Sequence, residues 1–193
     1  MSRSCQNIFD FKFKGMKGIV FTEFLEMVED RFGFSIVDQI IEGSNLSSGG
    51  VYTAVGTYDS SEMFSLVGQL SMCSGIPVPE LLRVYGQHLF TRFASGYGHF
   101  FSAVEDSFQF LEQIENYIHI EVRKLYPDAE LPNIRTQRLN ADTLELYYSS
   151  ERKMGHFALG LIEGCGLHYS ENYSISMENM NPTGSEVKFT IAR

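Results

Sequence analysis

The feature that most constrains the fold is a long helical pattern that prolines end and strand patterns follow. Residues 106–126 carry apolar side chains at spacings of three and four, at Leu111, Ile114, Ile118, Val122 and Leu125. This repeat is typical of one buried face of a helix. Pro127 cannot continue the helix, and Pro132 favours an extended connection after it. The helix therefore divides the chain into two parts.

Helical patterns fill the part before residue 106. We expect helices over about 17–31, 35–42, 59–75 and 80–95, where apolar residues recur at helical spacing between glycine and proline boundaries. Asp59 to Glu62 resembles a capping box that opens the third of them. Residues 43–58 indicate a loop and an extended piece. Gly86 marks a site for a bend in the fourth helix, although packing explains a glycine there equally well.

Strand patterns follow Pro132. They cover about 134–139, 143–150, 173–177 and 187–192, with one more helical pattern over about 153–169. The order predicts an α+β fold, in which an N-terminal helical part is followed by a long helix and a small antiparallel sheet.

Charge and cysteine usage argue against several classes of protein. The 24 Asp and Glu outnumber the 15 Lys and Arg, and the net charge of -9 disfavours a nucleic-acid or anionic-membrane surface. Cys5, Cys73 and Cys165 are odd in number and far apart, which indicates reduced thiols. Neither a signal peptide nor a membrane span is visible. We therefore expect a soluble, cytoplasmic protein.

One predicted strand turns polar along a face that begins as core. Alternation places Tyr148, Ser150 and Arg152 on the side of Leu144 and Leu146. Arginine binds a carboxylate through two charge-assisted hydrogen bonds, and hydroxyls satisfy the remaining lone pairs. The pattern is either the accidental end of a strand or a site for a ligand with paired carboxylates and an apolar body. Haem is such a ligand, and its iron takes a neutral imidazole.

Five histidines are candidates for binding a metal or for acid–base chemistry. His119 borders the apolar stripe of the long helix, but by itself a hydrogen-bonded core histidine is the commoner explanation. The other four, His88, His99, His156 and His168, lack a second ligand at metal spacing. The sequence also lacks GxSxG and nucleotide-loop motifs, so it gives little support to nucleophilic catalysis or phosphate binding.

Taken together, these motifs resemble the haem-nitric oxide/oxygen binding (H-NOX) family, to which the haem domain of soluble guanylate cyclase also belongs. Tyr148-Ser149-Ser150-Glu151-Arg152 is similar to its YxSxR propionate motif, and further matching stretches are 85–90, 118–127, 131–132 and 159–164. The resemblance covers residues 16–193 and leaves 1–15 as an appendage outside it. It implies haem b held between the two parts of the fold, with His119 as the axial iron ligand and Pro132 pressing on the porphyrin.

The resemblance also implies a gas sensor without catalytic turnover. Nitric oxide would bind the ferrous haem and weaken or break the bond to His119, and the haem would flatten away from Pro132. The N-terminal helices would then shift against the C-terminal half. The signal would pass in trans to a histidine kinase or a cyclic-di-GMP enzyme. Carbon monoxide is a second expected ligand.

The gas side of such a haem is expected to be apolar. Its candidate residues are Val20, Phe24, Leu89, Phe93, Phe157 and Leu161. Phe157 stands five residues after Arg152, where oxygen-binding relatives carry a tyrosine that donates a hydrogen bond to dioxygen. We therefore predict that oxygen is excluded. The alternative is a haem enzyme with peroxidase-like or nitric-oxide-consuming activity, which would need polar groups on this side.

Some members of the family carry zinc near the C-terminus. The corresponding positions here are Gly155, Met177, Met180 and Lys188. None of these is a zinc ligand of the usual kind, so zinc is not expected.

Overall fold

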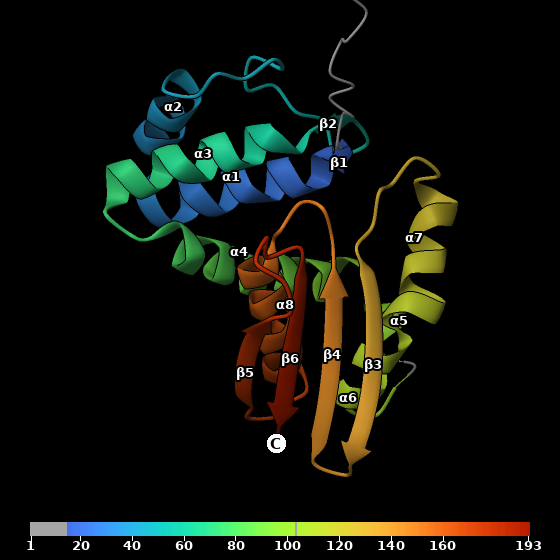
Figure 1. Ribbon diagram of the computed structural model, residues 1–193. Helices are drawn as coiled ribbons and strands as arrows, with labels where there is room; N and C mark the ends of the chain where they lie inside the picture. The colour runs from blue at the N-terminus through green and yellow to red at the C-terminus, as the bar shows by residue number, and fades with distance from the viewer. Residues whose placement is uncertain (1–14, 103) are drawn as a thin grey trace, which may run out of the picture.

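The computed structural model describes residues 15–102 and 104–193, and it combines helices with two antiparallel sheets (Figure 1). The predicted α+β fold is confirmed. Most of the expected appendage, residues 1–14, lies outside the described residues, whereas Gly15 begins the first strand. The domain boundary at residue 16 stays a prediction.

The N-terminal part is mostly helical. Its elements are β1 (Gly15–Lys17), α1 (Gly18–Phe32), α2 (Phe34–Glu42), β2 (Thr57–Asp59), α3 (Ser60–Ser74) and α4 (Val78–Gly96). β1 pairs antiparallel with β2, with Met16 opposite Tyr58. The extended piece before residue 59 was predicted, but its pairing with the start of the domain was not, because three-residue strands show no periodicity.

The start of α3 differs from the predicted capping box. The Asp59 carboxylate does cap the helix, because it accepts a hydrogen bond from the Ser61 amide at 2.8 Å. Glu62 instead turns to the preceding loop, where its carboxylate accepts hydrogen bonds from the hydroxyls of Ser47, Ser48 and Tyr52 at 2.5, 2.5 and 2.7 Å. The capping-box prediction is therefore wrong for Glu62, because three hydroxyls satisfy this buried carboxylate.

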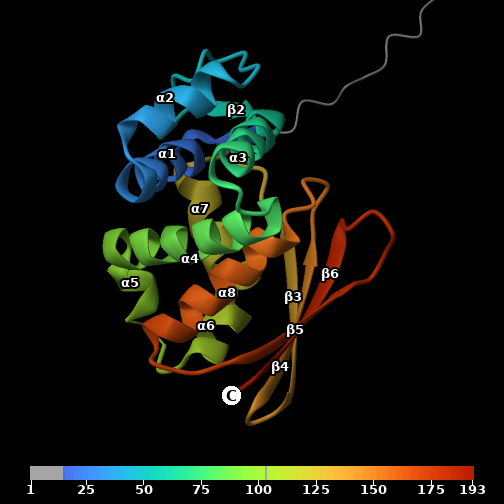
Figure 2. The same cartoon turned by 90° about the vertical axis from the view of Figure 1, so that its left-hand side faces the viewer.

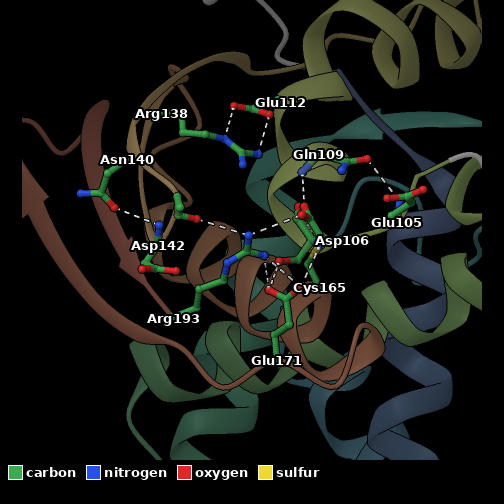
Figure 3. A network of polar contacts seen from close by, with 12 residues as sticks. Glu105, Asp106, Gln109, Glu112, Arg138, Asn140, Asp142, Cys165, Glu171 and Arg193 are labelled. Carbon is green, nitrogen blue, oxygen red and sulfur yellow. Dashed lines mark hydrogen bonds and ion pairs between the residues drawn. The ribbon is translucent and has the colours of Figure 1, made fainter.

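The C-terminal part holds the sheet and its helices. Its elements are α5 (Gly98–Phe101), α6 (Ser107–Gln113), the π-helix η1 (Ile114–Ile118), α7 (His119–Leu125), β3 (Asn133–Asn140), β4 (Thr143–Ser149), α8 (Gly155–His168), β5 (Ser174–Asn179) and β6 (Glu186–Ala192). The sheet is antiparallel, in the order β3-β4-β6-β5. A polar network ties its ends to α6, since Arg193 pairs with Glu171 and Asp106, and Arg138 pairs with Glu112 (Figure 3).

The predicted long helix is present but not uniform. Helical structure runs from Ser107 to Leu125, with a π-helical turn in its middle. At the end of that turn the His119 amide donates a hydrogen bond to the Ile114 carbonyl, five residues earlier. The π-helix is rare and often marks functional sites, and it was not predicted from the apolar spacing.

The two parts meet where α8 lies against α4 (Figure 2). A Cβ atom built on Gly86 of α4 would lie 2.3 Å from the Phe157 carbonyl oxygen, and one on Gly160 of α8 would lie 1.9 Å from the Arg83 carbonyl oxygen. Only glycine permits so close an approach of two backbones. α4 is continuous through Gly86, and this close packing suffices to explain the glycine.

Two apolar cores flank this contact. One gathers buried side chains of α1–α4, and the other lies among α6, α8 and the inner face of the sheet. Among the helices of residues 15–102 and 104–193, none is both long and apolar enough to cross a membrane.

Candidate functional site

A cavity of about 330 Å³ lies between the two parts of the fold. Its walls are α1, α4 and α8 on one side, and η1, α7 and the segment before β3 on the other. Most of the lining is apolar. The side chains that bring polar atoms to it include Lys17, Tyr97, His119, Tyr126, Glu130, Tyr148 and Arg152. An apolar cavity with a few convergent polar groups is the usual form of a cofactor site.

His119 lines this cavity and is only 8% exposed. Burial lowers the pKa of the imidazole, and the neighbouring Glu115 carboxylate acts in the opposite direction without reversing the shift. The ring is therefore neutral at pH 7. Its Nδ1 atom lies 3.0 Å from Glu115 Oε2, and because a carboxylate only accepts, Nδ1 carries the proton. The Nε2 atom keeps a free lone pair, which is what a metal ligand needs.

Glu115 is a site residue that the sequence analysis missed. Its Oε2 atom also accepts a hydrogen bond from the Ile134 amide at 3.1 Å, so one oxygen joins the histidine to β3. The sequence does contain a signal for it. Glu115 and His119 stand four residues apart, the spacing at which two side chains on a helix can form a hydrogen bond.

The predicted carboxylate-binding residues lie at the end of β4 and in the turn after it. Tyr148 and Arg152 line the cavity. Burial raises the pKa of the Tyr148 phenol, which therefore stays protonated and able to donate. The Arg152 guanidinium donates to the carbonyls of Gly15 and Glu130 at 2.7 and 2.5 Å.

Ser150 is placed outside the cavity lining. β4 ends at Ser149, so strand alternation no longer directs the next side chain. The Ser150 hydroxyl accepts a hydrogen bond from the Arg152 amide at 3.2 Å and so shapes the turn that carries the arginine.

Pro132 lies on the same side of the cavity as His119. It follows α7 and stands two residues before Ile134, whose amide donates to Glu115. The carboxylate thus links the histidine to the segment that carries the proline.

The opposite wall is hydrocarbon. Five of the six residues predicted for it line the cavity, namely Val20, Leu89, Phe93, Phe157 and Leu161. The sixth, Phe24, is fully buried outside the lining, with its ring 5.2 Å from that of Tyr85.

Two tyrosines near this wall were missed by the sequence analysis. Tyr85 is buried with its ring 5.2 Å from that of Phe157, and its hydroxyl donates to the Val20 carbonyl. Tyr97 lines the cavity just after α4. Burial, followed by the neighbouring Tyr126, raises the pKa of Tyr97. The Tyr85 hydroxyl therefore has the Val20 carbonyl as its partner, and the Tyr97 hydroxyl has Tyr126 as a polar neighbour.

Of the four positions at which zinc was not expected, Gly155 and Met177 lie side by side. A Cβ atom on Gly155 would meet Met177 Cε at 2.8 Å, and Lys188 pairs with Glu178 at 2.9 Å. Within residues 15–102 and 104–193, no group of three His, Cys, Asp or Glu side chains is arranged to hold a metal ion.

Comparison with known proteins places this site in a family. The haem-NO-binding family matches residues 17–177. Comparison with curated proteins found no match.

Solved structures give a detailed likeness. The unliganded Fe(II) H-NOX protein from K. algicida is 44% identical over 92% of this chain and 96% of its own, with a TM-score of 0.87. The H-NOX from Shewanella woodyi, solved in the Fe(II)CO state with IWP-051 bound, is 40% identical over 92% and 94%, with a TM-score of 0.79. The H-NOX protein from S. oneidensis in the Fe(II)NO state is 28% identical over 91% and 98%, with a TM-score of 0.81. This chain therefore belongs to the haem-NO-binding, or H-NOX, family.

Proposed function

We propose that this protein is a haem-based sensor of nitric oxide, with His119 as the axial ligand of the iron. The observation that carries the proposal is the state of His119, which is buried, neutral and hydrogen bonded at Nδ1, so that Nε2 is free to bind. The cavity also fits haem chemically, because its apolar walls suit the porphyrin and Arg152 and Tyr148 suit the propionates.

When bound, haem supplies a ferrous iron with one position open to a diatomic gas. His119 would hold the iron through Nε2, and Pro132 would contact the porphyrin from the cavity lining. Val20, Leu89, Phe93, Phe157 and Leu161 form the gas side and keep water from it.

Selectivity follows from the chemistry of that gas side. Dioxygen gains stability on ferrous iron from a hydrogen-bond donor, whereas nitric oxide depends far less on one. The five predicted residues on this wall have hydrocarbon side chains, and the nearby Tyr85 hydroxyl already donates to a backbone carbonyl. The Tyr97 phenol, which lines the cavity, lies beside Tyr126. The S. oneidensis and S. woodyi relatives were solved with NO and with CO. We expect nitric oxide and carbon monoxide to bind, and oxygen not to form a stable complex in air.

Contacts across the cavity offer a route for the signal. Asp128, in the segment before Pro132, pairs with Lys17 of β1 at 3.2 Å and accepts a hydrogen bond from Thr57 of β2 at 2.6 Å. Arg152 adds its two bonds to Gly15 and Glu130. A displacement of the Pro132 segment would therefore pull on β1, β2 and α1.

The output of this sensor is a protein contact rather than a reaction. A peroxidase-like or nitric-oxide-consuming enzyme would require a proton donor or acceptor on the gas side, and the five wall residues provide neither. We propose a separate partner, either a histidine kinase or a cyclic-di-GMP enzyme.

The substitution His119→Gly tests the proposal. It should abolish tight haem binding, and free imidazole should restore both haem and the ligated spectrum by filling the vacated space. His156→Ala is the control, because His156 is exposed on α8. Wild-type haem content and spectrum in His119→Gly without imidazole would show that another group binds the iron.

A further inference from the structure

We infer that Glu115 is a positioning residue, which holds the His119 imidazole in the tautomer that binds iron and ties it to the strand that follows Pro132. This inference rests on the proposed role of His119 and deepens it.

The geometry gives one carboxylate two tasks. Glu115 Oε2 lies 3.0 Å from His119 Nδ1 and accepts from the Ile134 amide at 3.1 Å. The other oxygen, Oε1, lies 3.7 Å from the Arg123 guanidinium, a longer contact that orients the group from the far side. A metal-binding histidine that donates its second ring proton to a carboxylate is held in one orientation and becomes a more basic ligand.

The π-helical turn explains how His119 comes to face the cavity while Glu115 faces β3. Ile118 and His119 are consecutive, yet both line it, together with Ile114 at the start of the turn. The wider turn holds one residue more than an α-helical turn, so it carries His119 to the cavity wall. Glu115 lies within the same turn, with its side chain toward β3.

The hydrogen bond from the Ile134 amide connects the Glu115 carboxylate to the segment that carries Pro132. Pro132 stands two residues before this amide, so the positions of the histidine and the proline are set through a shared oxygen. Movement of His119 would strain or release this contact. Glu115 therefore couples the state of the axial ligand to the Pro132 segment through one side chain.

Glu115→Gln tests the inference without haem. The amide oxygen can take the place of Oε2 and accept from both the Ile134 amide and His119 Nδ1, but it is neutral and therefore a weaker acceptor than a carboxylate. In ¹⁵N-detected imidazole spectra of the haem-free protein, the wild type should show the proton on Nδ1. In Glu115→Gln the population with the proton on Nδ1 should fall, and the population with the proton on Nε2, the atom required for iron, should rise.

A second readout uses the haem-loaded protein. The iron–histidine stretching band in resonance Raman should shift to lower wavenumber in Glu115→Gln, and haem should be lost roughly 10 to 100-fold faster. Glu112→Gln is the matched control. Glu112 stands three residues before Glu115 in the same helical run, and its carboxylate pairs with Arg138 instead of a histidine. It should behave as the wild type in both measurements.

The outcomes separate this inference from the proposed function. If His119→Gly keeps its haem spectrum, the proposed ligand is wrong. If His119→Gly loses ligation while Glu115→Gln shows wild-type tautomer populations and an unshifted band, only the role of Glu115 is overturned. If Glu115→Gln fails to fold, Glu115→Asp is the replacement test, because its side chain is one methylene shorter and holds the carboxylate farther from His119 Nδ1. Its tautomer populations should shift in the same direction, and wild-type populations there would equally overturn the inference.

Discussion

The two walls of the cavity differ in both chemistry and construction. The wall of η1, α7 and the Pro132 segment presents His119, held by a carboxylate, whereas the wall of α1, α4 and α8 presents hydrocarbon. A diatomic gas on the proposed gas side would meet no donor among the five predicted residues that line it, so we expect its affinity to depend on the iron and on the ligand opposite. From this asymmetry we propose that the lack of a hydrogen-bond donor on the gas side, rather than an attractive contact there, favours nitric oxide over oxygen.

The walls also differ in how firmly they are held. The gas side rests on the close backbone contact of α4 with α8 at Gly86 and Gly160, which leaves no space for adjustment. The histidine side rests on side-chain hydrogen bonds of Glu115, Lys17 and Arg152 to neighbouring segments. Bonds of this kind can exchange partners, so we expect the histidine side to move when a signal is transmitted.

The largest effect is expected where the two walls are joined. Arg152→Ala removes the guanidinium that bonds to both Gly15 and Glu130 and that suits the propionates. Loss of a charged hydrogen-bond partner costs about 1.5 to 3 kcal/mol, and a neutral one about 1 kcal/mol. Haem transfer to apomyoglobin should therefore be clearly faster for Arg152→Ala than for Ser150→Ala, whose hydroxyl lies outside the cavity lining. Equal transfer rates would contradict this placement.

The next effect concerns the rigid wall. Gly160→Ala places a methyl group against the Arg83 carbonyl and must separate α4 from α8, which costs about 1 to 3 kcal/mol of unfolding free energy. Gly68→Ala is the control, because Gly68 lies in α3 with open space around its Cα, and alanine there stabilises by up to about 1 kcal/mol. Urea unfolding measures both. A neutral Gly160→Ala would show that this wall adjusts freely.

The smallest effect is expected from one added oxygen atom. Phe157→Tyr places a hydroxyl on the gas side and should create weak oxygen binding, because one hydrogen bond contributes about 0.5 to 1.5 kcal/mol. Nitric oxide affinity should change less. Tyr97→Phe removes a phenol from the cavity lining and should leave gas binding unchanged. Titrations of each variant with oxygen and with nitric oxide, followed by absorption, measure both affinities. An equal rise in nitric oxide affinity in Phe157→Tyr would contradict the view that the added hydroxyl stabilises oxygen selectively.

Much of the fold followed from the sequence because its signals are local. The apolar spacing of the long helix, the prolines after it and the alternation of β4 predicted elements that the structure contains. Sequence reasoning failed where a residue found partners far along the chain. Glu62 binds hydroxyls 10 to 15 positions earlier, and Gly15 pairs with Asp59 across α1, α2 and the loop that follows them.

The site was predicted unevenly for the same reason. His119, Tyr148 and Arg152 reach the cavity, but Ser150 does not, because the strand ends one residue before it. Phe24 packs behind the wall that it was expected to form. Glu115 was missed although it stands four residues before His119, a spacing at which helical side chains pair. The apolar periodicity does not mark the π-helical turn that brings His119 to the cavity.

The central claim is that a histidine on one wall and hydrocarbon on the other make a sensor that responds to nitric oxide and ignores oxygen. The most direct measurement is the absorption spectrum of the haem-loaded, ferrous protein, recorded first under argon and then in air, in carbon monoxide and in nitric oxide. We expect the argon spectrum to persist in air until the iron slowly oxidises, and distinct spectra to form at once with the other two gases. A stable, distinct spectrum in air that reverts under argon would contradict the account.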